Sequence, residues 1–288
     1  MNDKISGKRK FKIILLNTLV CLSAGIIILM LTGIIGYIFY RGIQNLSVEF
    51  LTSAPSLIND KVGILPNMLN TVYIILMALV IVLPLGVGAA IYLNEYCKNK
   101  KLVRIIELAT ETLSGIPSII YGLVGMLIFV QFCSLGTSLA AGALTLVIMT
   151  LPTIIRTTQE SLKTIPNSYR EGSLALGAGK WHMIRTVVLP SAVDGIVTGC
   201  ILSVGRIIGE SAALLFTAGM ANNMFYIFES ILPEKAGSTL TVALYVYAKE
   251  RGDFEIAFSI AVILLVLTFV INLSAKFAGR ALRKRRER

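Results

Sequence analysis

Long stretches without a charged residue constrain this chain more than any other feature. Residues 13–40, 62–94, 112–155 and 256–275 contain no Asp, Glu, Lys or Arg. An α-helix needs about 20 mostly apolar residues to cross the roughly 30 Å hydrocarbon core of a bilayer, and each stretch is long enough. The mean hydropathy of +0.78 is also too high for an ordinary soluble domain. The sequence therefore predicts an all-α integral membrane protein.

The uncharged stretches divide into six expected spans. Residues 112–155 are too many for one crossing, so a turn over residues 131–138 (QFCSLGTS) is expected to split them. A further apolar segment runs from Val193 to about Phe216, although it contains Arg206 and Glu210. The first span is longer than the apolar region of a signal peptide, so we expect it to be retained. The expected transmembrane helices cover residues 13–40, 69–93, 113–132, 137–155, 193–216 and 256–275.

The distribution of Lys and Arg predicts the orientation. Alternate segments, beginning with the N-terminal tail 1–12 and ending with the basic tail 276–288, carry 21 of the 27 basic residues, and the other loops carry 5. Cytoplasmic segments are enriched in Lys and Arg, so both termini are expected in the cytoplasm. This pattern accounts for the net charge of +11 without a nucleic-acid partner.

No residue pattern predicts a metal or catalytic site. The four cysteines, Cys21, Cys97, Cys133 and Cys200, lack paired or metal-ligand spacing, and His182 is the only histidine. The GAGK sequence at residues 177–180 lacks the first Gly and the Ser or Thr of a phosphate-binding loop. We therefore expect no cofactor in this chain.

The loop at residues 156–190, here called the coupling loop, has helix boundary signals of its own. Ser168 and Glu171 fit a capping box, Gly177 and Gly179 are expected to end that first helix, and a second helix is expected from residue 180 to 188, stopped by Pro190. Two short helices at a bend could transmit force to a soluble partner. The segment 218–253 is the longest one on the opposite side, and we expect it to form a surface for an outside partner.

The coupling loop resembles that of bacterial ABC importer permeases. Glu171, Gly177, Leu189 and Pro190 have the spacing of the family signature, and Gly172 stands where the family has alanine. The resemblance implies a type I ABC importer permease fold, in which coupling helices sit in a groove of separate ATPase subunits that bind ATP and Mg. An alternative is an amphipathic loop lying on the lipid surface with Trp181 as an anchor.

Three further stretches resemble permeases of phosphate importers, in particular the PstA-type subunit. They are SGIPSIIYGL, LPTIIRTTQESLKTIPNSYREGSLALGAGKW and GRIIGESAALLFTAG, at residues 114–123, 151–181 and 205–219. This resemblance implies phosphate as the substrate and the bacterial cytoplasmic membrane as the location. It also implies three kinds of partner: a sister PstC-type permease forming a heterodimer, two ATPase subunits and an extracytoplasmic phosphate-binding protein.

Arg206 and Glu210 are expected inside a span, where a charge costs about 2.5–3.5 kcal/mol. At positions i and i+4 they would share one face of a helix. Two readings stay open: a structural ion pair, or an anion pathway in which Arg206 contacts phosphate and Glu210 competes for Arg206.

Arg156, Ser114 and Gly115 are weaker candidates for contact with the anion. Arg156 lies where the fourth span reaches the cytoplasm, and the resemblance associates this position with phosphate passage. An ordinary positively charged anchor explains Arg156 equally well. Ser114 and Gly115 are expected to begin the third span and to offer free backbone N–H groups, although Pro117 as a helix starter accounts for the same residues.

Other functions remain open at this stage. The substrate could be another oxyanion, sulfate or molybdate. A secondary transporter that needs no ATPase would use Arg206 and Glu210 as an ion relay. A membrane scaffold that transports nothing is the third alternative.

Overall fold

The computed structural model describes residues 7–55, 62–224 and 229–284, and within them every regular element is helical. Four helices are long and apolar enough to cross a membrane, and up to six spans result if each of two bent pairs is one span. The all-α membrane fold expected from the sequence is therefore confirmed. The four long helices are α1 (Gly7–Gly42), α3 (Leu65–Ile91, extended by the π-helical turn η2, Tyr92–Tyr96), α6 (Leu139–Lys163) and α13 (Phe254–Lys284).

The first bent pair corrects the expected third span. Helix α4 (Lys100–Ser114) meets α5 (Ser118–Gly125) and its π-helical extension η3 (Met126–Phe132) at an angle of 100°. The helix that was expected to begin at residue 113 therefore begins at Ser118. Pro117 explains the break, because a proline disfavours helical geometry in the residue before it.

The second bent pair corrects the expected fifth span. The helical turns from Lys180 to Ser191 join α10 (Val193–Gly209) at an angle of 63°. The span expected to run to residue 216 ends at Gly209, because Glu210 has extended backbone angles (φ −85°, ψ 120°). A separate helix, α11 (Ala212–Thr217), follows.

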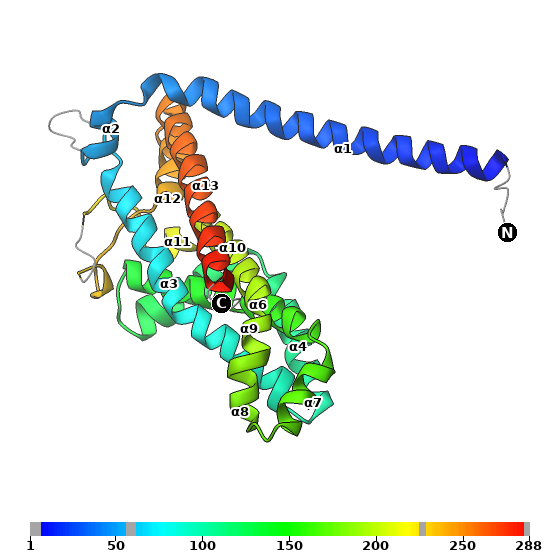
Figure 1. The fold of residues 1–288 in the computed structure, drawn as a ribbon. Coiled ribbons are helices and arrows are strands. Elements are labelled where there is room, and N and C mark those ends of the chain that lie inside the picture. Colours follow the sequence, from blue (N-terminus) through cyan, green and yellow to red (C-terminus); the bar gives the residue numbers. More distant parts are fainter. Residues whose placement is uncertain (1–6, 56–61, 225–228, 285–288) are drawn as a thin grey trace.

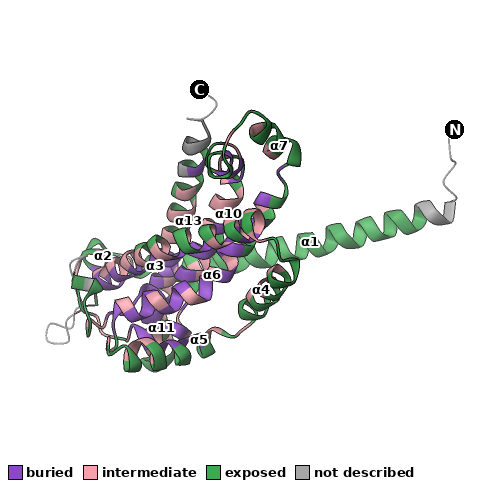
Figure 2. Cartoon of the chain, turned by 90° about the horizontal axis from the view of Figure 1, so that it is seen from below, coloured by how far each residue is buried: buried purple, intermediate pink, exposed green. Residues whose placement is uncertain are grey.

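Helix α6 lies at the centre of the bundle (Figure 2). It is the least apolar of the four long helices but the most buried, with 67% of its apolar window covered, against 33% for α3 and α13. Polar side chains on a transmembrane helix are costly toward lipid, so such a helix belongs in the protein interior. The buried hydroxyls of Thr145 and Thr150 still find hydrogen-bond partners within the helix, because each donates to a carbonyl one turn earlier, over 2.8 and 2.7 Å.

Helices α6 and α10 pack closely because α10 presents small residues to α6. A Cβ at Gly195 would overlap Ser161, and a Cβ at Gly199 would overlap Thr157. The Ser161 hydroxyl also donates to the carbonyl of Ala192, over 3.1 Å. Small residues spaced four apart let membrane helices approach one another, and here they hold the first half of α10 against the last turns of α6.

Helix α1 leaves the bundle and projects from it, as Figure 1 shows. Its C-terminal end is fixed to α13, where Tyr37 stacks edge-on against Phe258 with ring centroids 5.5 Å apart and Ser259 donates to the carbonyl of Gly42 over 2.9 Å. Residues 11–37 of the helix are all exposed. A short 3-10 turn, η1 (Ile43–Asn45), and helix α2 (Val48–Thr52) follow.

The segment 218–253 is not the surface loop that the sequence led us to expect. Its second half contains α12 (Leu240–Tyr245) and the π-helical turn η6 (Val246–Glu250), after a 3-10 turn at Glu229–Ile231. Ser238 and Thr239 are buried, and the amides of Asn67 and Asn70 on α3 donate to the carbonyl of Ser238, each over 3.3 Å. These polar contacts hold the segment against α3, so only part of it remains available to a partner; residues 225–228 lie outside the described chain.

Candidate functional site

The first helix of the coupling loop, α7 (Asn167–Ala175), begins without a capping box. Its N-cap position is Pro166, and no side chain accepts a hydrogen bond there. The expected cap at Ser168 is wrong because Ser168 already lies within the helix. Proline has a fixed φ and no N–H, so it fits at a helix boundary, and the helix starts directly after it.

The expected turn after α7 contains Gly177 with φ +85°, a backbone conformation that favours glycine. The second helix begins at Lys180 as α8 (Lys180–Met183) and continues through the π-helical turn η4 (Ile184–Val188) into α9 (Leu189–Ser191). Pro190 therefore does not stop this helix. It lies just after the π-helical turn η4, and the 63° bend follows Ser191, one residue later.

A buried ion pair joins the coupling loop to α3. One oxygen of the Glu95 carboxylate, Oε1, accepts from Nη2 of Arg170 over 2.9 Å and from its Nε over 3.1 Å. The two side chains are 6% and 15% exposed. Nη2 of Arg170 also donates to the carbonyl of Leu162 over 2.9 Å, and Nη1 donates to that of Ile165 over 2.8 Å. One guanidinium thus connects the ends of α3 and α6 with α7.

Lys180 makes the second connection to the end of α3. Its Nζ donates to the backbone carbonyl of Glu95 and lies 4.8 Å from the centroid of the Tyr96 ring, in a cation–π contact. We call Glu95, Tyr96, Arg170 and Lys180 the α3–loop junction. An apolar cluster separate from the main core lies in the same region and comprises Ala90, Leu162, Ile165, Met183, Ile184, Val188 and Ala192.

The outer face of the coupling loop is exposed and partly apolar. Leu176, between the two helices, is 90% exposed, and Trp181, Tyr169 and Leu174 are exposed as well. Of the signature residues, Glu171, Gly172 and Gly177 are exposed, and Leu189 and Pro190 are partly buried. This arrangement places an exposed, partly apolar tip where a soluble protein can bind it.

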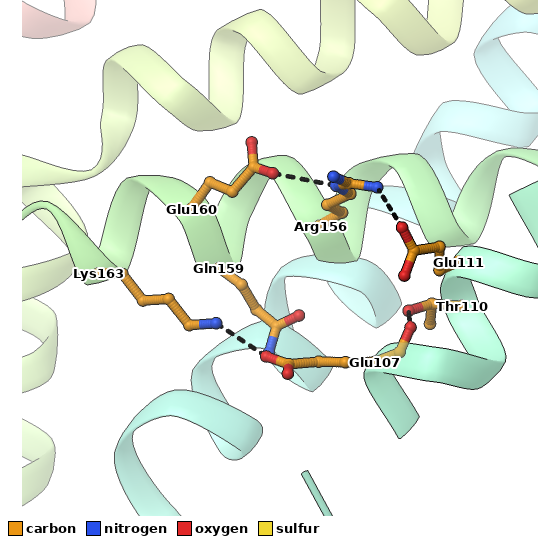
Figure 3. Close-up of a pocket in the computed structure, with 7 residues that line it drawn as sticks. All are labelled: Glu107, Thr110, Glu111, Arg156, Gln159, Glu160 and Lys163. Carbon is orange, nitrogen blue, oxygen red and sulfur yellow. Dashed lines mark hydrogen bonds and ion pairs between the residues drawn. The ribbon is translucent and has the colours of Figure 1, made fainter. Parts of the chain in front are cut away.

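Arg156 lies in a cavity of about 220 Å³ between α4 and α6, shown in Figure 3. Its Nε donates to Glu160 over 3.0 Å, and its Nη1 lies 3.7 Å from Glu111. Lys163, further along α6, pairs with Glu107 over 2.8 Å. Three carboxylates thus face two cations, and Arg156 already has two acidic partners in this structure. The complete lining is Glu107, Thr110, Glu111, Arg156, Gln159, Glu160 and Lys163.

Arg206 and Glu210 do not pair in the structure. The helix ends between them at Gly209, so the expectation that they share one face of a continuous helix is wrong. Glu210 is buried, and its Oε1 accepts from the N–H of Ala213 over 2.9 Å, which satisfies a free donor in the first turn of α11. The Glu210 carbonyl accepts from the Thr241 hydroxyl over 2.9 Å.

Arg206 stands apart from the other candidates. It is partly exposed, makes no hydrogen bond or ion pair with any residue that the structure describes, and lies within electrostatic range of Tyr121. Gly199, which packs on Thr157 beside Arg156, precedes Arg206 by seven residues, roughly 10 Å along a helix axis. The two arginines therefore lie at different depths in the bundle.

Ser114 and Gly115 lie at the end of a helix rather than at its start. The Ser114 hydroxyl donates to the carbonyl of Glu111 over 2.7 Å, and the Gly115 N–H donates to that of Thr112 over 3.1 Å. These donors are therefore occupied within the chain, and the helix start that was expected to offer free N–H groups lies at Ser118 instead.

The coupling loop and the bundle that carries it are those of a known family. The family described as the binding-protein-dependent transport system inner membrane component matches residues 82–288. This chain belongs to that permease family. It is a multi-pass membrane protein and a transport subunit of an ABC importer, and it is not an enzyme.

Relatives of the permease are similar over most of their length. A probable ABC transporter permease protein of Bacillus subtilis (strain 168), YqgI, is 35% identical, with 99% of each chain covered. The phosphate transport system permease protein PstA of Pasteurella multocida (strain Pm70) is 32% identical over 93% of this chain and 94% of its own.

Solved structures show the same fold. A bacterial ABC transporter of alginate, in complex with a pentasaccharide-bound periplasmic protein, superposes with a TM-score of 0.66 at 14% identity, covering 98% of this chain and 99% of its own. The inward-facing MetNI methionine ABC transporter gives a TM-score of 0.59 at 22% identity, covering 76% and 94%. The permease therefore has the type I importer fold expected from its coupling loop.

Sequence reasoning missed the residues of the α3–loop junction. Glu95 and Arg170 are far apart in the chain, and Arg170 was counted only as a basic residue of a cytoplasmic loop. The sequence places Lys180 in the GAGK stretch and at the start of the second coupling-loop helix, and neither position indicates a contact with Glu95. One signal was available: Glu95 directly follows the uncharged stretch 62–94, so an acidic group stands at the end of a span.

Proposed function

We propose that this permease is the membrane-spanning subunit of an ATP-driven importer that carries inorganic phosphate into the cell. The observation that carries the importer assignment is the exposed apolar tip of the coupling loop, joined to the bundle through buried contacts at Arg170. Phosphate as the substrate is supported by the PstA relatives, which are 32–35% identical to this chain over much of its length.

Besides this chain and lipid, the proposed assembly has three kinds of protein component. A sister permease of the PstC type completes the membrane unit, and a PstC protein of Mesorhizobium japonicum that is 30% identical to this chain supports such a pairing of similar chains. Two ATPase subunits, which bind ATP and Mg, contact the end of the bundle that carries α7 and α8. An extracytoplasmic protein delivers phosphate at the opposite end of the bundle. Both termini of this chain lie in the cytoplasm of a bacterial cell, by the positive-inside rule.

Arg206 is the proposed phosphate contact. A guanidinium stays charged and presents a planar donor set that suits phosphate oxygens, and Arg206 has none of the acidic partners that occupy Arg156. Glu210 keeps a structural role at the break between α10 and α11, and Arg156 is proposed to contact phosphate only when its carboxylate partners move away.

Co-purification followed by reconstitution tests the function. The chain is purified with the products of neighbouring genes and placed in liposomes, and ATP hydrolysis is measured with phosphate, sulfate or molybdate and the binding protein. Stimulation by phosphate alone is expected. Stimulation by sulfate or molybdate instead would move the assignment to another oxyanion, and ion flux without any ATPase would identify a secondary transporter.

Replacing Arg206 tests the pathway within that function. Arg206→Ala removes no contact to a described residue, so normal abundance in the membrane is expected together with loss of most phosphate uptake. Arg206→Lys keeps the charge but not the planar donor set, and partial uptake is expected. Uptake by Arg206→Ala at the wild-type rate would contradict the proposed contact.

A further inference from the structure

We propose that Glu95 and Arg170 are positioning residues that transmit the movement of α7 to α3 during transport. Neither belongs to the signature of the coupling loop. The inference rests on the proposed function, because it concerns how ATP-driven movement of the coupling loop reaches the membrane helices.

The hydrogen bonds of Arg170 connect three elements through one side chain. Its guanidinium binds Glu95 at the end of α3, the carbonyl of Leu162 at the end of α6, and Oδ1 of Asn167 in the first turn of α7 over 3.3 Å. Asn94 also donates to Glu95 Oε1, over 2.7 Å, and so holds the carboxylate in place. A planar guanidinium with this many hydrogen bonds is held in one orientation. Because Arg170 belongs to α7, these bonds also fix the position of α7 relative to α3 and α6.

Burial makes this ion pair difficult to separate. The side chains of Glu95 and Arg170 are 6% and 15% exposed, so moving α7 away from α3 would leave charges without partners in a poorly solvated place. The neighbouring apolar cluster joins α3 and α6 to α8 and η4 and includes no residue of α7, and apolar contact is in any case non-directional and tolerates sliding. When α7 moves, the ion pair is therefore expected to pull the end of α3 in the same direction.

Helix α3 reaches the opposite end of the bundle. Asn67 and Asn70, in its first turns, hold Ser238 of the segment 218–253. A displacement of Glu95 along α3 would therefore reach the segment expected to meet the phosphate-delivering protein. The contacts thus form a path from α7 through Glu95 and α3 to Ser238. If the α3–loop junction only anchored the coupling loop, no such path to the opposite end of the bundle would be needed.

The test measures phosphate imported per ATP hydrolysed by the complete importer in proteoliposomes. Arg170→Gln removes one charge, the double variant Glu95→Gln with Arg170→Gln removes both and leaves no uncompensated buried charge, and Arg170→Lys keeps the charge alone. We expect the ratio to fall roughly 2- to 30-fold in the first two variants, the usual range for coupling residues, and less in Arg170→Lys. ATP hydrolysis itself is expected to continue.

Arg104→Gln is the matched control, because Arg104 is an exposed arginine on α4, and the wild-type ratio is expected. A wild-type ratio of phosphate imported to ATP hydrolysed overturns the inference if it is found in an assembled complex that carries Arg170→Gln or the double substitution. Failure of all three variants to assemble with the ATPases also overturns it, because the pair would then be needed for folding. If the wild-type complex imports no phosphate, the proposed function fails instead.

Discussion

Gly177 and Gly179 form a matched pair for testing the turn of the coupling loop. At neither position would an added Cβ lie within 4 Å of a neighbouring atom, but Gly177 has φ +85° whereas Gly179 has φ −66°. Gly177→Ala should therefore strain the turn by about 1–2 kcal/mol, and Gly179→Ala should not. We expect less ATPase to co-purify with Gly177→Ala only. Equal recovery with both variants would show that the turn tolerates a side chain.

Gly199 and Gly205 test the contact between α6 and α10 in the same way. A Cβ at Gly199 would overlap the Thr157 side chain, whereas the space at Gly205 is open. Gly199→Ala should lower the free energy of unfolding by about 1–3 kcal/mol through overpacking. Gly205→Ala should leave it unchanged or raise it by up to about 1 kcal/mol. Thermal unfolding of the two purified variants in detergent measures the difference, and identical Tm values would contradict the close contact.

At the scale of elements, the pair of helices α7 and α8 should act as one docking unit. Leu176 lies between them and is 90% exposed, so Leu176→Asp should leave the fold intact while placing a charge in a contact that we expect to be apolar. Binding of the ATPase should weaken by at least about tenfold, the 1–2 kcal/mol typical of an apolar interface residue. Val48→Asp, at an exposed apolar position on α2, is the control and should bind normally.

Several helix boundaries depend on contacts between segments that are distant in the sequence. The sequence located the turn at residues 131–138 and the glycine turn after α7, because both rest on local conformational preferences. It did not predict the break at Glu210, which is stabilised by a hydrogen bond to Ala213 and by Thr241, about 30 residues away. Nor did it predict that α4 and α5 meet at 100°.

At the scale of the whole molecule, the native cysteines test the orientation. Cys133 is exposed in the turn after η3, and Cys97 lies between α3 and α4 at the opposite end of the bundle. With Cys21 and Cys200 replaced by Ala, a membrane-impermeant thiol reagent applied to spheroplasts should label Cys133 at once and Cys97 only after permeabilisation. The reverse order would place both termini outside the cell.

The sequence by itself determined that the chain is an all-α membrane protein and that residues 156–190 carry the signature of a coupling loop. The length of an apolar span and the position of turn-forming residues are local properties, so they can be inferred from the sequence without knowledge of the tertiary structure. Some partners of the charged candidates are local too, such as Glu160 four residues after Arg156, but Glu111 and Thr241 come from distant segments.

Only the tertiary structure decided which charges meet. It separated Arg206 from Glu210, brought Glu111 of α4 to Arg156, and brought Arg170 to Glu95 across 75 residues of chain. Ion pairs between distant segments depend on how helices pack, and the partner that a small residue such as Gly199 meets is known only from the packed bundle. The connection between the coupling loop and α3 is therefore visible only once the helices are assembled.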